Sequence, residues 1–211
     1  MILFNEYIQM KKNPNHPKKG SRIQVSPITN KRIIKRIKQD LVDNPRNSLL
    51  FIMGINTALR ASDLLGLKTA QVHHLNAGDS FVVYERKTKK PRRITINKAV
   101  HDALREWLDK YDGEWLFPSQ RKGMVITVPA LNLMVKKWCA TAHLETGIKQ
   151  NGTNYGSHTL RKTFGYWQRI DAGVPIHTLM KIFNHSSQAI TLTYLGIQEQ
   201  EIEDVYMGYE L

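Results

Sequence analysis

Hydrophobic residues recur at helical spacing over most of the chain and at strand spacing in one short stretch. A helix is predicted to begin near Thr29 or Asn30, because apolar side chains follow three or four residues apart at Ile33, Ile34, Ile37 and Leu41. The apolar run over 49–59 predicts a second and more buried helix. A third, short helix is predicted over 61–65, ending near Gly66.

Helical spacing stops between residues 81 and 96. The segments 81–84 and 93–96 are rich in β-branched and aromatic residues, and the segment 88–91 between them suits a turn. Together they predict an antiparallel hairpin with a strongly basic tip.

Helical spacing returns after the hairpin. Asn97 is a predicted N-cap for a long helix with one apolar face, formed by Val100, Leu104, Trp107, Leu108 and Tyr111. Pro129 suits the first turn of another helix, which carries Leu131, Val135, Trp138 and Ala142. Shorter helices are predicted around 159–171, 175–183 and 187–195, followed by an acidic one over 198–206. The predicted fold class is therefore α+β, mainly α-helical, with a small antiparallel β-sheet.

A chain of 211 residues is long enough to bury a full hydrophobic core. Residues 1–25 are polar, basic and interrupted by prolines, so we expect a flexible basic arm rather than a packed element. One domain is expected over 26–197, and an acidic helix or tail over 198–211. The apolar face of that tail is expected to dock either on a neighbouring protomer or on its own domain.

The chain carries 31 Lys and Arg residues against 18 Asp and Glu, a net charge of +13. Such an excess favours a polyanionic partner, because each neutralised phosphate releases counterions. The candidate DNA-binding residues form two clusters, Lys11, Lys12, Lys18 and Lys19 in the arm, and Arg86, Lys89, Lys90, Arg92 and Arg93 in the hairpin. Charge alone fits RNA, the ribosome or an anionic membrane equally well, and a charged run is also typical of a solvated face.

Several classes of site and location are disfavoured by the sequence. Cys139 is the sole cysteine, which excludes an internal disulfide and a cysteine metal cluster. His158 and His185 lack a carboxylate or cysteine at ligand spacing, and no glycine-rich nucleotide loop occurs, so no metal and no cofactor are expected. No apolar run reaches the ~18 residues of a membrane span, and the first residues lack a signal-peptide pattern. We expect a cytoplasmic protein, associated with the nucleoid when bound to DNA.

Residue types that suit phosphate chemistry gather in two parts of the sequence. Arg60 and Arg161 suit the binding of phosphate oxygens, because a guanidinium stays charged and can bind two oxygens at once. His158 and Arg161 are three residues apart and share a helical face. Asp63, one helical turn after Arg60, is expected to orient that guanidinium. Taken singly, these residues also fit a surface ion pair, a histidine cap or a tyrosine packed in the core.

The motifs together resemble the catalytic domain of the tyrosine recombinases, also called phage integrases. They are Thr57-Ala58-Leu59-Arg60-Ala61-Ser62-Asp63-Leu64, His158-Thr159-Leu160-Arg161-Lys162-Thr163-Phe164, and His185-Ser186-Ser187 through Tyr194-Leu195. The resemblance runs from about Pro27 to Gln198. It implies that the enzyme cuts one DNA strand, holds it as a 3′-phosphotyrosine and passes it to a new 5′-hydroxyl.

The resemblance also assigns roles to single residues. Tyr194 is the expected nucleophile, and Arg60, Arg161, His158 and His185 are expected around the phosphate. His158 is the candidate acceptor of the tyrosine proton. The expected general acid is Lys87, with Lys89 and Lys90 as alternatives. Double-stranded DNA, self-association on it as a dimer or tetramer, and a role in DNA integration for a phage or mobile element are implied as well.

The sequence departs from the family pattern at two points. Asn184 stands where the family most often has glycine, and asparagine also tolerates the left-handed conformation that such a cap requires. Arg60 also comes too early for the N-terminal helical domain that many members carry. Two alternatives remain open: a non-catalytic or regulatory DNA-binding relative, and a nuclease that uses His158 and His185 as an acid–base pair on RNA.

Overall fold

The computed structural model describes residues 24–121, 123–196 and 207–208. In chain order the elements are α1 (Lys31–Asp40), α2 (Pro45–Asn56), α3 (Ala61–Leu65), the short 3₁₀ helix η1 (Thr69–Gln71), β1 (Ser80–Tyr84), β2 (Pro91–Thr95), α4 (Lys98–Leu108), α5 (Val128–Thr146), α6 (Ser157–Ile170), α7 (Ile176–Phe183) and α8 (Gln188–Leu195). This architecture confirms the predicted fold class. No helix in the described ranges is long and apolar enough to cross a membrane.

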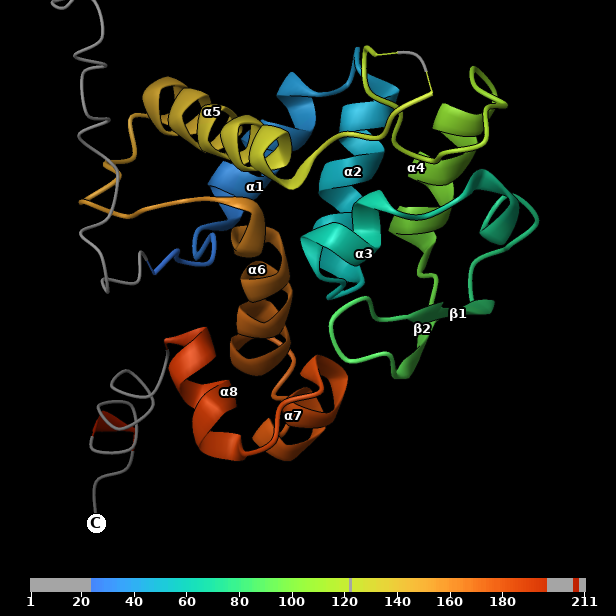
Figure 1. Ribbon diagram of the computed structural model, residues 1–211. Coiled ribbons are helices and arrows are strands. Elements are labelled where there is room, and N and C mark those ends of the chain that lie inside the picture. Colours follow the sequence, from blue (N-terminus) through green and yellow to red (C-terminus); the bar gives the residue numbers. More distant parts are fainter. Residues whose placement is uncertain (1–23, 122, 197–206, 209–211) are drawn as a thin grey trace, which may run out of the picture.

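Helix α2 lies at the centre of the main hydrophobic core. Its residues Leu49, Leu50, Phe51 and Met53 are all at most 1% exposed, so neighbours cover more than one face of the helix. It packs against α4 on one side and α6 on another, while α1 packs on α5 (Figure 1). Asn30 and Asn97 cap α1 and α4 as predicted, since each accepts a backbone N–H of the following turn. Pro129 lies in the first turn of α5 as predicted, and Thr127 caps that helix in addition.

The hairpin confirms the predicted change to strand spacing. Strands β1 and β2 pair antiparallel, with Ser80 opposite Thr95 and Tyr84 opposite Pro91. Phe81 and Val83 are buried, whereas the residue between them is exposed. The loop over 85–90 is closed by two backbone hydrogen bonds between its ends, and it holds the basic tip.

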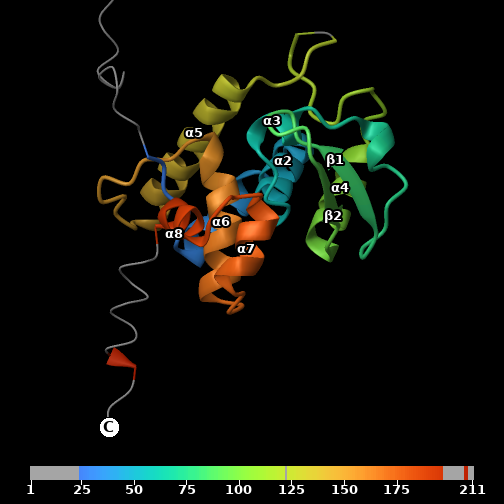
Figure 2. The same cartoon turned by 60° about the horizontal axis from the view of Figure 1, so that its bottom comes forward.

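A smaller hydrophobic cluster joins α6, α7 and α8. Its buried residues are Ala58, Leu179, Phe183 and Leu195, and Phe164 and Tyr166 of α6 pack against them. Helix α6 approaches closely at Gly165, where an added Cβ would come 2.5 Å from the Phe183 ring and 2.6 Å from Leu195. Figure 1 shows α6 running from the main core toward the end of the molecule where α7, α8 and the hairpin lie. The same end faces the reader more directly in Figure 2.

The predicted helix over 49–59 is wrong at both ends. Helix α2 begins at Pro45 and stops at Asn56. Thr57 Oγ1 donates to the Met53 carbonyl (2.8 Å), and Ala58 then adopts a left-handed conformation with φ of 52°. Arg60 is consequently the N-cap of α3 rather than the end of an apolar helix.

Residues 1–23 of the predicted arm (1–25) and the predicted acidic helix over 198–206 lie outside the described residues. The division into arm, domain and tail therefore stays a prediction.

Candidate active site

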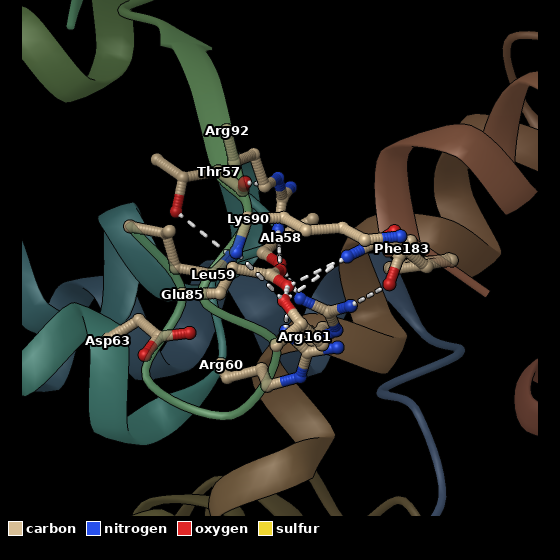
Figure 3. Close-up of polar contacts among 12 residues, drawn as sticks. Thr57, Ala58, Leu59, Arg60, Asp63, Glu85, Lys90, Arg92, Arg161 and Phe183 are labelled. Atoms are coloured by element: carbon tan, nitrogen blue, oxygen red, sulfur yellow. Dashed lines mark hydrogen bonds and ion pairs between the residues drawn. The ribbon is translucent and has the colours of Figure 1, made fainter. Parts of the chain in front are cut away.

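Two arginines, one buried and one partly buried, bind the backbone just after α2. The Ala58 carbonyl accepts from Arg161 Nη1 and from Arg92 Nη1, the latter at 2.6 Å, and Arg92 Nη2 donates to the Thr57 carbonyl at 2.8 Å (Figure 3). Carbonyls at the end of a helix lack intrahelical partners and carry partial negative charge, which suits cationic donors. The break in the helix thus assembles the centre of the site.

Arg161 is the most enclosed cation of the predicted site. Arg161 is 3% exposed. Its Nη2 donates to the Phe183 carbonyl at 2.7 Å, and its guanidinium carbon lies 4.9 Å from the centre of the Phe183 ring. Burial lowers the pKa of Arg161, but a guanidinium remains charged at neutral pH. Backbone groups from two separate segments therefore hold this positive charge in one place.

Arg60 is held differently, by a carboxylate. Its Nη1 lies 2.5 Å from Glu85 Oε2, and its side chain is 17% exposed. The expected partner Asp63 instead accepts the backbone N–H of Arg86 through Oδ1, at 3.0 Å. The prediction for Asp63 is wrong because Arg60 has the extended backbone of an N-cap, so helical spacing does not bring its side chain to Asp63. No dashed line joins these two residues in Figure 3.

Glu85 is a site residue that the sequence reasoning missed. Its carboxylate is 1% exposed, accepts from Thr88 Oγ1 (2.6 Å) and Asn184 Nδ2 (3.0 Å), and lies 3.9 Å from Arg92 Nη1. Burial alone would raise the pKa of this carboxyl, but Arg60, Thr88 and Asn184 bring it down to about 2. A signal was present, since Glu85 continues the inward-facing alternation of Phe81 and Val83.

His185 follows directly on the left-handed cap of α7. Asn184 has φ of 53° and ψ of 46°, which confirms that asparagine takes this conformation here. The His185 N–H donates to the Met180 carbonyl (3.0 Å), and Nδ1 lies 3.1 Å from Thr191 Oγ1. Partial burial, and then the charges of Arg161 and Arg60, lower the pKa of His185 to about 4. This histidine is neutral at physiological pH.

Tyr194 lies on α8 with its ring enclosed by other side chains. The ring centre is 5.2 Å from that of His185 and 5.3 Å from that of Phe183, and Lys162 Nζ lies 4.9 Å from it. The hydroxyl is buried beside Arg161, without a well-formed hydrogen bond to the described part of the chain. Burial raises the pKa of Tyr194, against the opposing effect of Arg161 and Arg60. A buried hydroxyl next to cations is suited to meet an incoming anion.

His158 and Tyr194 share a cavity of about 860 Å³. Further residues lining it include Asn132, Ser157, Lys162 and Ile190. The His158 side chain is exposed at this cavity, yet partial burial of the ring, and then the charges of Arg161 and Lys162, lower its pKa. His158 therefore favours the neutral form, which can accept a proton.

The hairpin loop supplies exposed cations next to these groups. Lys87 is exposed, and its charge is near enough to help lower the pKa of His158. The side chains of Arg86, Lys89, Lys90 and Arg93 are exposed as well. Arg92 is the exception among the predicted DNA-binding residues, because its guanidinium faces inward and is bound to the Thr57 and Ala58 carbonyls. The four arm lysines lie outside the described residues.

The predicted catalytic residues thus meet at one end of the molecule. Arg60, Arg161, His185 and Tyr194 are linked by contacts and charge, His158 joins them through the shared cavity, and Lys87 approaches from the hairpin. Within the described ranges, no cluster of three or more His, Cys, Asp or Glu residues could hold a metal ion. The arrangement combines two fixed guanidinium groups, a buried phenol, two neutral histidines and a free amine.

Comparison with known proteins identifies the family. A family model described as "Phage integrase family" matches residues 18–201, so the chain belongs to the phage integrase family, whose members are tyrosine recombinases. The "Probable integrase/recombinase YoeC" of Bacillus subtilis is 38% identical over 186 residues, which cover 86% of this chain and 95% of that protein. "Tyrosine recombinase XerC" of Caldanaerobacter subterraneus is 27% identical, over 77% of this chain and 45% of its own length.

Solved structures share the fold. The crystal structure of XerA recombinase matches with a TM-score of 0.69 at 20% identity, covering 90% of this chain and 67% of that one. A post-cleavage complex of XerH site-specific recombinase with a palindromic difH substrate matches with a TM-score of 0.68 at 19% identity, covering 87% and 51%. A lambda integrase dimer bound to a COC′ core site matches with a TM-score of 0.61 at 17% identity, covering 83% and 49%.

Proposed function

We propose that this chain cuts and rejoins double-stranded DNA at specific sites through a 3′-phosphotyrosine intermediate, with Tyr194 as the nucleophile. The observation that carries the proposal is the buried Tyr194 hydroxyl beside Arg161, with Arg60 in the same cluster of charge. A non-catalytic DNA-binding module has no need of a phenol held at this place.

In the proposed reaction, Tyr194 Oη attacks the scissile phosphorus and the bond from phosphorus to the 5′-oxygen breaks. Arg60 and Arg161 stabilise the negative charge that grows on the non-bridging oxygens. Neutral His158 accepts the tyrosine proton, and neutral His185 donates a hydrogen bond to the phosphate. Lys87 gives a proton to the departing 5′-oxygen. Attack by a new 5′-hydroxyl reverses these steps and releases the tyrosine.

Binding of the duplex is assigned to the exposed cations. Arg86, Lys89, Lys90 and Arg93 surround Lys87 on the hairpin and are free of the inward bonds that hold Arg92. Phosphate contacts of this kind position a protein on DNA without reading its sequence. We propose that the arm over 1–25 adds to this contact, and that protomers associate on DNA, because strand exchange joins two sites and cuts four strands.

The setting proposed for this chemistry is DNA integration or excision for a phage or another mobile element, in the cytoplasm and on the nucleoid. Two relatives support DNA as the partner, since the XerH and lambda integrase structures are complexes with DNA sites.

Covalent capture tests the function and selects the target site in the same experiment. Full-length protein is mixed with nicked duplexes that carry randomised inverted half-sites, in which cleavage releases a short fragment and traps the enzyme on the DNA. We expect attachment that survives denaturation and enriches one sequence. Tyr194→Phe removes only the hydroxyl and should bind the enriched duplex without attaching to it. Free ends released equally by both proteins would support the nuclease alternative and contradict the proposal.

A further inference from the structure

We propose that Asn184 and Glu85 form a latch that ties the hairpin loop to the end of α7 and thereby fixes Lys87 for proton donation. This inference rests on the proposed function, and it assigns to Asn184 a positioning role beyond that of a helix cap. The latch consists of Glu85, Thr88 and Asn184.

The side chain of Asn184 is not needed for the cap itself. A left-handed residue at the end of a helix is satisfied by its backbone, and glycine adopts that conformation more easily than asparagine. Here the backbone N–H groups of Asn184 and His185 already bond the Lys181 and Met180 carbonyls, at 3.1 and 3.0 Å. The side chain is therefore available for a contact outside its own helix.

That contact is made by the amide nitrogen of Asn184. Asn184 Nδ2 donates to Glu85 Oε2 at 3.0 Å and to Thr88 Oγ1 at 3.3 Å, while Thr88 Oγ1 donates to the same Glu85 oxygen at 2.6 Å. The opposite orientation of the amide would place its oxygen against a buried carboxylate, which fixes the assignment chemically. The network joins Asn184 to Glu85 and Thr88, which lie 99 and 96 positions earlier in the sequence.

The latch acts on the loop that carries Lys87. The loop is closed by Glu85 N–H to the Lys90 carbonyl (3.0 Å) and by Lys89 N–H to the Glu85 carbonyl (2.8 Å). On one side of Lys87, the Arg86 N–H is bound by Asp63 of α3. On the other side, Thr88 is bound by Asn184 at the end of α7.

The backbone of Lys87 is therefore tethered at both neighbours, while its side chain is exposed and makes no hydrogen bond or ion pair to the described residues. This arrangement suits an amine that must reach a leaving oxygen. The backbone holds the Cα of Lys87 in position, and the amine itself stays free to move. Loss of the Asn184 contact removes the tether on the α7 side, which is the side of His185 and Tyr194.

The test compares two substrates that differ in one bridging atom. Each is the nicked duplex enriched by covalent capture, with either oxygen or sulfur as the 5′-bridging atom, and a thiolate leaves without needing a proton. Lys87→Ala is the benchmark for loss of the acid. Asn184→Gly keeps the left-handed cap and deletes the latch. We expect it to slow attachment to the oxygen substrate about tenfold, a fraction of what a general acid contributes, and to leave the sulfur substrate within about twofold of wild type.

Two further variants keep the test independent of folding. Thr88→Val removes the hydroxyl at similar volume and should reproduce the substrate dependence of Asn184→Gly, with the double variant no slower than either, because both act through one network. Asn151→Gly makes the same change at another left-handed asparagine, which is exposed and outside the latch, and should behave as wild type on both substrates.

Equal slowing on the oxygen and sulfur substrates would overturn the inference, because the latch would then act on Arg60 or Tyr194 instead of the acid. Unchanged rates in both latch variants would overturn it too. If wild-type protein attaches to neither substrate, the proposed function itself has failed.

Discussion

Arg161 and Lys87 bring positive charge to the same site in opposite ways. Arg161 is 3% exposed and bonded to two backbone carbonyls, from residues 103 and 22 positions away in the sequence. Lys87 is exposed on a hairpin loop, with a tethered backbone and a free amine. The protein holds the guanidinium of Arg161 in one place, whereas for Lys87 it positions the backbone and leaves the amine free to move.

This difference matches the two tasks that phosphoryl transfer sets. Charge on the non-bridging oxygens grows at a fixed place, so a donor that needs no reorganisation stabilises it best. A proton must instead travel to a leaving oxygen, which a short movement of an unbound amine permits. Arg60 is intermediate, because a carboxylate side chain holds it and 17% of its side-chain surface remains exposed.

The largest effect is expected from Arg161→Lys, which keeps a positive charge but loses the fork that reaches both carbonyls. We expect cleavage to fall by about 10²–10³-fold, as for removal of an oxyanion donor, together with a clear drop in melting temperature. Arg60→Lys should lose a comparable factor in rate with a smaller drop in melting temperature, because a side chain rather than the backbone holds it. Single-turnover attachment and calorimetry measure the two effects. A larger loss of stability in Arg60→Lys would break the comparison.

A smaller effect separates the inward-facing and outward-facing arginines of β2. Arg93→Ala should weaken DNA binding and reduce the slope of log affinity against log salt by about 0.9, the contribution of one phosphate contact. Arg92→Ala should leave that slope unchanged and lower the melting temperature, because its guanidinium binds the Thr57 and Ala58 carbonyls. Titrations of labelled duplex over a series of salt concentrations distinguish the two. An equal loss of slope in both variants would mean that Arg92 also contacts DNA.

The smallest effect concerns the neutral state of His185. Its pKa is about 4 in the folded protein and rises toward the ordinary 6.5 on unfolding, so the unfolded chain binds the extra proton between these values. Stability from this residue is therefore full above pH 6.5 and declines as pH falls toward 4. The melting temperature of wild type should drop more between about pH 7 and pH 5 than that of His185→Gln. His177→Gln, at an exposed histidine on α7, serves as the control and should keep the wild-type response.

Much of this architecture could be predicted from local pattern. The hairpin follows from the strand-like composition over 81–84 and 93–96, the starts of α1 and α4 follow from their capping residues, and the start of α5 follows from Pro129. The family motifs pointed to the six candidate catalytic residues, and these meet at one end of the molecule.

What sequence reasoning missed depends on contacts distant in sequence. The run over 49–59 has the composition of one helix, but the chain leaves the helix at Asn56, and Arg92 and Arg161 bind the carbonyls that follow. Helical spacing suggested Asp63 as the partner of the Arg60 guanidinium. In the tertiary fold the partner is Glu85, the residue that follows the end of β1. The alternation of inward-facing residues along the first strand predicts that Glu85 is buried, but its partners Arg60, Thr88 and Asn184 cannot be identified without the fold.

The most direct test of the account is to identify the residue that carries the DNA. Full-length protein trapped on the enriched nicked duplex is digested with protease and nuclease, and the attachment is located by mass spectrometry. We expect a nucleotide adduct on the peptide containing Tyr194, linked through its hydroxyl to a 3′-phosphate. An adduct on any other residue, or a 5′-linked adduct, would contradict it.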